Sequence, residues 1–92
     1  MKTDRTPDPA IIEATMLDLL QRRGAGKTIC PSEVARAVVG EATGWREAMP
    51  LVRAVAGRLV RADLVVATQR GVPVDPRRAE GPIRLGLPQH GD

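Results

Sequence analysis

The chain has 92 residues and a net charge of +3, which suits one small domain and leaves no room for a second. Hydrophobic residues make up 42%, but there is no Phe or Tyr and only one Trp, so the core must be built from aliphatic side chains. No segment approaches the roughly 20 apolar residues that span a bilayer, and residues 1–9, MKTDRTPDP, carry no apolar signal-peptide segment. We expect one domain over residues 8–88, with flexible tails at 1–7 and 89–92.

The positive charge lies in the second half of the chain. Basic and acidic residues cancel over residues 1–44, whereas residues 45–92 carry eight arginines and five acidic residues. Because twelve of the fourteen basic residues are arginine, a GC-rich genome explains this preference as well as function does. A net charge of +3 is weak evidence for a polyanionic partner, and only its clustering gives it weight.

The first predicted element is a helix that begins after residue 8. Asp8 is a suitable N-cap, Pro9 suits the first helical position, and Gly24 suits the left-handed stop. The apolar positions that would form its buried face are Ile12, Met16, Leu19 and Leu20.

A short strand at 27–29 and a second helix are expected next. Pro31 suits the first position of this helix, and Glu33 would place a carboxylate beside the free N–H groups of its first turn. Gly40 would end it. The single cysteine, Cys30, precedes this helix and has no disulfide partner, which fits a reducing cytoplasm.

A third helix follows, interrupted by a proline. We interpret 45–49 as one helical turn and Pro50 as the start of the helix proper, because an interior proline loses a hydrogen bond. Its core side would consist of Val52, Val55, Ala56 and Leu59. Its other side would carry Arg53, Ala54, Gly57, Arg58 and Arg61.

The last third of the chain predicts two strands, at 64–69 and 82–87, which pair as a hairpin around a long loop at 70–81. The order helix, short strand, helix, helix, strand, loop, strand is that of a winged helix. The expected fold class is therefore α+β, a winged helix-turn-helix with three helices, a small antiparallel sheet and a C-terminal β-hairpin wing.

In such folds the third helix commonly enters the major groove of DNA. Arginine suits this role because its planar fork grips phosphate oxygens or the edge of guanine. Ala54 and Gly57 would allow the helix backbone to approach a groove closely. The residues expected to contact double-stranded DNA are Arg46, Arg53, Arg58, Arg61, Arg70, Arg77 and Arg78.

Other interpretations stay open. Charges on the outer face of an amphipathic helix are usually only solvated, and winged helices also serve as protein-interaction or dimerisation modules. A homodimer is compatible with DNA binding, because one such module is small beside the roughly 1,000–2,500 Å² of a specific site. We expect no enzyme activity, no cofactor and no membrane association. His90 stands alone, so it cannot complete a metal site, and Trp45 is interpreted as the largest core side chain.

Several motifs together resemble one family. They are Cys30-Pro31-Ser32-Glu33-Val34-Ala35-Arg36, Trp45-Arg46, Met49-Pro50, Val52-Arg53, Arg58-Leu59, Thr68-Gln69, Gly71, Val74-Asp75-Pro76 and Gly81-Pro82-Ile83-Arg84-Leu85. The chain resembles, over about residues 10–87, a small bacterial family known only as a domain of unknown function, number thirty-two fifty-three. The resemblance implies a winged-helix fold and brings no activity, substrate or catalytic residue.

These motifs raise a question about the first turns of the second and third helices. An ion pair between Arg46 and Glu33 would be a structural use of the motif, holding the two helices together. The alternative is a phosphate-binding patch of arginines and helix N-terminal amides formed by Ser32, Arg36, Arg46 and Arg53.

Overall fold

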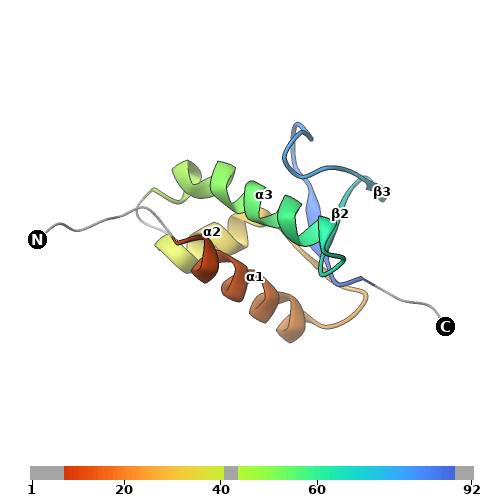
Figure 1. Ribbon diagram of the computed structural model, residues 1–92, viewed down its shortest axis with the longest axis horizontal. Coiled ribbons are helices and arrows are strands. Elements are labelled where there is room, and N and C mark those ends of the chain that lie inside the picture. Colours follow the sequence, from red (N-terminus) through yellow and green to blue (C-terminus); the bar gives the residue numbers. More distant parts are fainter. Residues whose placement is uncertain (1–7, 41–43, 89–92) are drawn as a thin grey trace, which may run out of the picture.

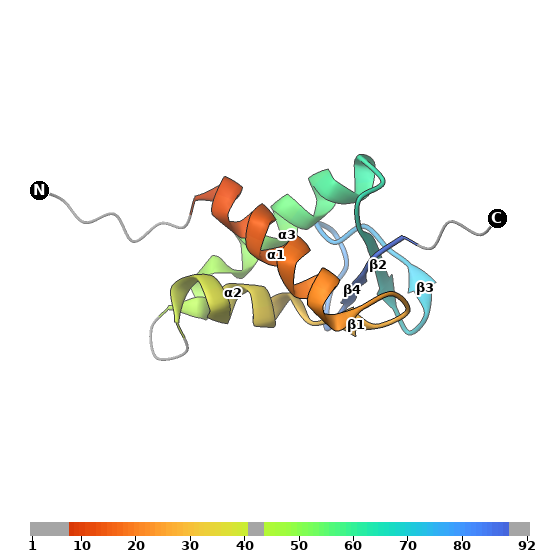
Figure 2. The same cartoon turned by 90° about the horizontal axis from the view of Figure 1, so that it is seen from below.

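The computed structural model describes residues 8–40 and 44–88. Its three helices are α1 (Pro9–Arg23), α2 (Pro31–Val39) and α3 (Trp45–Arg61), and they pack together beside a four-stranded antiparallel sheet (Figures 1 and 2). The expected α+β class, with three helices and a small antiparallel sheet, is confirmed. In the described ranges no helix is both long and apolar enough to cross a bilayer. The predicted tails at 1–7 and 89–92, with His90, lie outside the described residues.

The starts of the first two helices are set by local chemistry, as predicted. The Asp8 carboxylate accepts a hydrogen bond from the N–H of Ala10 at 2.9 Å, and Pro9 is the first helical residue of α1. At α2 the Glu33 carboxylate accepts from the N–H of Cys30 at 3.0 Å. Each carboxylate satisfies an N–H group that has no partner within its helix.

The third helix differs from the prediction. α3 runs without interruption from Trp45 to Arg61, so the expected start at Pro50 was wrong. Pro50 leaves the carbonyl of Arg46 without its usual helical donor. The buried side chains of Ala48 and Val52 lie on both sides of the proline, and their burial holds both parts of the helix against the same core.

The sheet contains β1 (Thr28–Ile29), β2 (Val66–Gln69), β3 (Val72–Pro73) and β4 (Arg84–Gly86) in the order β1-β4-β2-β3. The predicted antiparallel pairing of the two main strands is confirmed, with Ala67 opposite Leu85.

The strand β3 was not predicted and lies within the expected loop. Arg70 and Gly71 connect it to β2, and both have positive φ, at 54° and 82°. Two such residues form the tight turn whose twist matches paired strands. Pro73 is tolerated because β3 is an edge strand.

One aliphatic core joins the helices to the inner face of the sheet. Its largest fully buried side chains include Ile12, Met16, Leu20, Ile29, Ile83 and Leu85. Trp45 packs against this core but is only half-buried, which corrects its assignment as the largest core side chain. Its ring therefore remains available to surface residues.

Candidate nucleic-acid interface

Residues 74–81, which we call the 74–81 loop, lie along α3 and are held there by Arg53. The Nη1 of Arg53 donates to the carbonyl of Ala79 at 2.6 Å, and its Nη2 donates to the carbonyl of Gly81 at 2.7 Å. A longer bond of 3.4 Å reaches the carbonyl of Pro76. Both terminal nitrogens of this predicted DNA contact are thus occupied by the protein's own main chain.

The 74–81 loop is fastened at its far end by a second side chain. The Nε2 of Gln69, at the end of β2, donates to the carbonyls of Glu80 at 2.6 Å and Pro82 at 3.1 Å. Five carbonyl groups of an irregular segment are therefore satisfied by Arg53 and Gln69. Such bonds define one conformation for a loop that has no secondary structure of its own.

Gly57 faces the same loop. A Cβ atom at this position would lie 2.6 Å from Cδ and 2.8 Å from Cγ of Arg77. The glycine thus makes room for the aliphatic part of the Arg77 side chain, which crosses α3 at this point. The expectation that Gly57 opens the helix to a DNA groove needs correction, since Gly57 is buried in the protein itself.

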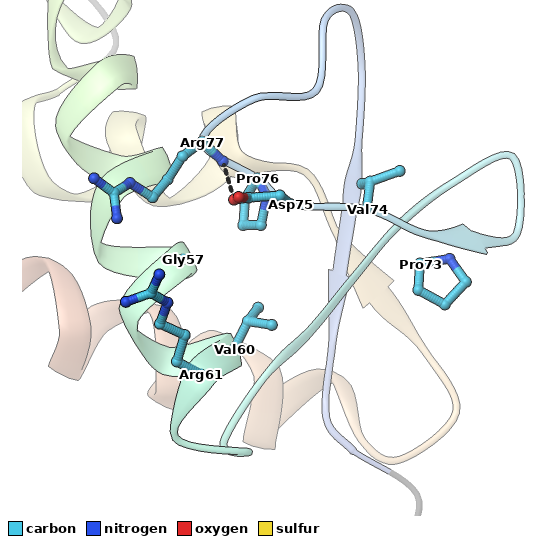
Figure 3. A pocket seen from close by; sticks show the side chains of 8 residues that line it. All are labelled: Gly57, Val60, Arg61, Pro73, Val74, Asp75, Pro76 and Arg77. Atoms are coloured by element: carbon cyan, nitrogen blue, oxygen red, sulfur yellow. Dashed lines mark hydrogen bonds between the residues drawn. The ribbon is translucent and has the colours of Figure 1, made fainter.

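Two hollows lie between α3 and the loop, and both are lined by Arg77. The first, of about 350 Å³, is drawn in Figure 3 and has Arg61 and Arg77 beside an apolar wall. The second extends toward the start of α3. The charged residues lining the two hollows are Arg46, Arg53, Arg61, Arg77, Arg78, Asp75 and Glu80. Five arginines against two acids make this face electropositive.

Asp75 is itself engaged in local bonds. Its Oδ1 accepts from the N–H of Arg77 at 2.9 Å, and its Oδ2 lies 3.9 Å from Nε of Arg78. The first contact fixes the turn of the loop after Asp75. The second is an exposed pair of long separation, which leaves the Arg78 guanidinium largely available to solvent and ligands.

At the start of α3, two arginines contact the ring of Trp45. The guanidinium carbon of Arg36 lies 4.4 Å from the ring centroid, and that of Arg46 lies 4.5 Å away. Such cation–π contacts hold long side chains in place without neutralising their charge. Arg46 therefore remains cationic at the edge of the second hollow.

These positions correct both expectations for the family motifs. Glu33 pairs with Arg23, at 2.6 Å, and the expected ion pair between Glu33 and Arg46 is replaced by this contact. The patch predicted from Ser32, Arg36, Arg46 and Arg53 is not assembled as a set of free groups, because Arg53 is bound to the 74–81 loop.

The other two predicted contacts lie apart from the hollows. Arg58 pairs with Glu13 of α1 at 3.1 Å, and both side chains are partly exposed. Arg70 lies in the turn between β2 and β3, in a third hollow that it shares with Arg84.

Part of α3 stays uncovered beside the loop. The exposed residues on this side of the helix are Arg46, Glu47, Pro50, Ala54, Arg58 and Arg61. Because the 74–81 loop covers Arg53 and Gly57, the surface of α3 that is open to a ligand is narrower than the sequence pattern indicated.

Asp75, Glu80 and Gln69 were not recognised in the sequence as parts of this site. For Asp75 the signal was present, since Asp before Pro often begins a turn and its carboxylate commonly accepts a nearby N–H. Glu80 and Gln69 gave no such signal, because their place depends on the path of the loop.

The fold and this face together define an α+β domain whose distinguishing surface is an arginine-lined strip between α3 and the 74–81 loop. The chain belongs to the family described as Protein of unknown function (DUF3253), whose model matches residues 9–88. None of the curated proteins matches the chain. Within residues 8–40 and 44–88 no group of acidic, histidine and cysteine residues could hold a metal ion.

Proposed function

We propose that this protein is a winged-helix-like, non-catalytic module that binds double-stranded DNA through the strip between α3 and the 74–81 loop. The observation that carries the proposal is the gathering of Arg46, Arg61, Arg77 and Arg78 around two adjoining hollows. Guanidinium groups gathered on one face supply the positive charge that attracts a nucleic-acid backbone. A cytoplasmic location forms part of the proposal, in keeping with the free thiol of Cys30.

In this proposal the arginines have different tasks. Arg61, Arg77 and Arg78 would contact phosphates, and Arg46, held against Trp45, would extend the contact toward the start of α3. The uncovered side of α3, around Ala54, would face the groove, with Arg58 released from its exposed pair with Glu13. Arg70 would contact the backbone from the turn between β2 and β3. Arg53 would hold the loop instead of touching DNA.

A protein partner or a second copy of the chain is the competing candidate. It would need an exposed apolar patch. The exposed large hydrophobic residues in the described ranges are Ile11, Leu64, Val66 and Val72. Of these, Val66 and Val72 lie in the sheet and are 41% and 61% exposed. Val72 pairs with Gln69, which is three residues from Val66 along β2, so the two valines point to opposite faces of the sheet. Val66 and Val72 therefore do not combine into one apolar patch on the sheet, which is the patch that an interface through this sheet would need.

The test is fluorescence anisotropy of a labelled mixed-sequence duplex, titrated with protein at several salt concentrations. We expect the logarithm of the binding constant to fall linearly with the logarithm of salt concentration. Arg78→Ala should weaken binding uniformly across sequences and reduce the salt slope by about 1. The matched control is Arg22→Ala, which removes the same charge from the exposed pair with Asp18 on α1. Absence of salt-dependent binding would refute the proposal. Sedimentation in an analytical ultracentrifuge would then test whether the protein self-associates.

A further inference from the structure

We infer that Arg61 and Arg77 form a clamp for a single phosphate group over the first hollow, and that Gly57 positions this clamp. The inference rests on the proposed function where the phosphate is that of a DNA backbone. A free phosphorylated compound offers the same chemistry, and the experiment below separates the two sources.

The position of Arg77 is determined by α3. Its Cγ and Cδ occupy the space that a side chain at residue 57 would fill. The main-chain N–H of Arg77 is fixed separately by the carboxylate of Asp75, at 2.9 Å. With its backbone and its aliphatic carbons both held, the Arg77 guanidinium loses less conformational freedom when it binds an anion than a free surface arginine does.

Arg61 lies one helical turn beyond Gly57, on the same side of α3. Figure 3 shows the guanidinium groups of Arg61 and Arg77 both at the α3 side of the hollow, away from Pro73 and Val74. The described structure pairs neither of them with an acidic side chain. Because both cations line the same hollow, an anion bound between them is attracted to each.

The remaining lining of the hollow strengthens this attraction. Val60, Pro73, Val74 and Pro76 form an apolar wall, which lowers the local dielectric constant next to the two cations. Among the described residues that line the hollow, Asp75 is the one acidic residue; its Oδ1 accepts from the main-chain N–H of Arg77, and its Oδ2 lies 3.9 Å from Nε of Arg78. A tetrahedral phosphate supplies oxygens to both arginine forks at once, which a point charge cannot do.

The experiment follows the arginine Nε–H signals of the full chain by NMR, first with inorganic phosphate and then with a mixed-sequence duplex. We expect saturable shifts of the Arg61 and Arg77 signals with each probe. Gly57→Ala displaces the Arg77 side chain without changing any charge, and it should weaken the binding of inorganic phosphate by about tenfold. Arg77→Ala should weaken phosphate binding to the same extent. Alanine is a better helix former than glycine, and thermal unfolding verifies that the Gly57→Ala variant is folded.

Arg61→Ala should also weaken phosphate binding by about tenfold. The matched control for both arginine variants is Arg22→Ala, which removes the same charge from an exposed pair on α1 and should weaken phosphate binding less than about threefold. Equal losses in variants and control, or phosphate shifts that Gly57→Ala does not alter, would overturn the clamp. Duplex binding without shifts at Arg61 and Arg77 would overturn the clamp and leave DNA binding intact. Phosphate shifts at both arginines without duplex binding would support the clamp, assign it to a free phosphorylated compound and refute DNA binding.

Discussion

The Arg23 guanidinium at the end of α1 donates to the Glu33 carboxylate in the first turn of α2 at 2.6 Å. The same carboxylate accepts from the N–H of Cys30, so one side chain caps α2 and ties it to α1. Burial raises the pKa of Glu33, but the Cys30 N–H and the nearby positive charges of Arg23 and Arg84 outweigh burial and lower that pKa below its ordinary 4.5.

This lowered pKa predicts acid sensitivity. A carboxyl group whose folded-state pKa is depressed stabilises the protein above its unfolded-state pKa, and the stabilisation is lost as pH falls below about 4.5 through the folded-state value. Glu33→Gln should cost about 1 kcal/mol at neutral pH and flatten the acid limb of the stability curve. Urea unfolding between pH 3 and pH 7 measures both effects, with Asp18→Asn as a control in an exposed pair. Parallel pH curves for wild type and Glu33→Gln would contradict the prediction.

A second prediction concerns the hold of Arg53 on the 74–81 loop. Lysine keeps the charge at this position but cannot reach three carbonyls in the fork geometry of arginine. Arg53→Lys should lower the free energy of unfolding by about 1–3 kcal/mol and make the bonds after Arg77 and Arg78 more accessible to trypsin. Limited proteolysis followed by mass spectrometry detects these cuts. Arg58→Lys, on the same helix, is the control, and an Arg53→Lys loop as resistant as wild type would refute this role.

A third prediction follows from Pro50 within α3. Pro50→Ala supplies the missing N–H to the carbonyl of Arg46 and removes the ring that crowds it. Because Pro50 is exposed, the change leaves the core intact. We expect the free energy of unfolding to rise by about 1–3 kcal/mol, measured by thermal and chemical unfolding. Ala54→Pro, one turn later, should have the opposite effect. A Pro50→Ala variant of equal or lower stability would show that the proline is accommodated without cost.

A fourth prediction uses Asp75, the acidic residue beside the proposed clamp. Asn at this position still accepts from the N–H of Arg77 and therefore keeps the turn, but it removes the negative charge. Asp75→Asn should tighten binding of the duplex and of inorganic phosphate by about two- to tenfold at low salt, with a smaller gain at high salt. Asp63→Asn, beyond the end of α3, controls for the change in net charge. Weaker binding by Asp75→Asn would place the carboxylate among the groups that the ligand needs.

Local signals in the sequence were sufficient for some elements. Asp8 with Pro9, and Pro31 with Glu33, indicate helix starts because the capping bonds reach only two or three residues along the chain. Such local signals could not predict that α3 continues through Pro50, because this continuity depends on packing on both sides of the proline. The strand β3 was missed for a related reason, since two residues give no alternation and their pairing depends on the turn before them.

The arginine-lined face was likewise predictable only in part from the sequence. The concentration of arginine in the second half of the chain indicated the elements that form this face, and the structure brings Arg46, Arg61, Arg77 and Arg78 to its two hollows. The task of Arg53 could not be predicted, because its hydrogen-bond partners lie 23 to 28 residues away. Sequence composition identifies charged residues, whereas tertiary contacts determine which of them are free to bind.

The position of β4 between β1 and β2 has a consequence for synthesis of the protein. The strand that joins the two halves of the sheet is the last of the four to leave the ribosome. Until it does, β1 has no strand neighbour in the sheet, and the core lacks the fully buried Ile83 and Leu85. The helices can form earlier from local contacts, but the sheet closes only after β4 has been synthesised. A nascent chain shorter than about residue 86 should therefore remain susceptible to proteases and dependent on chaperones.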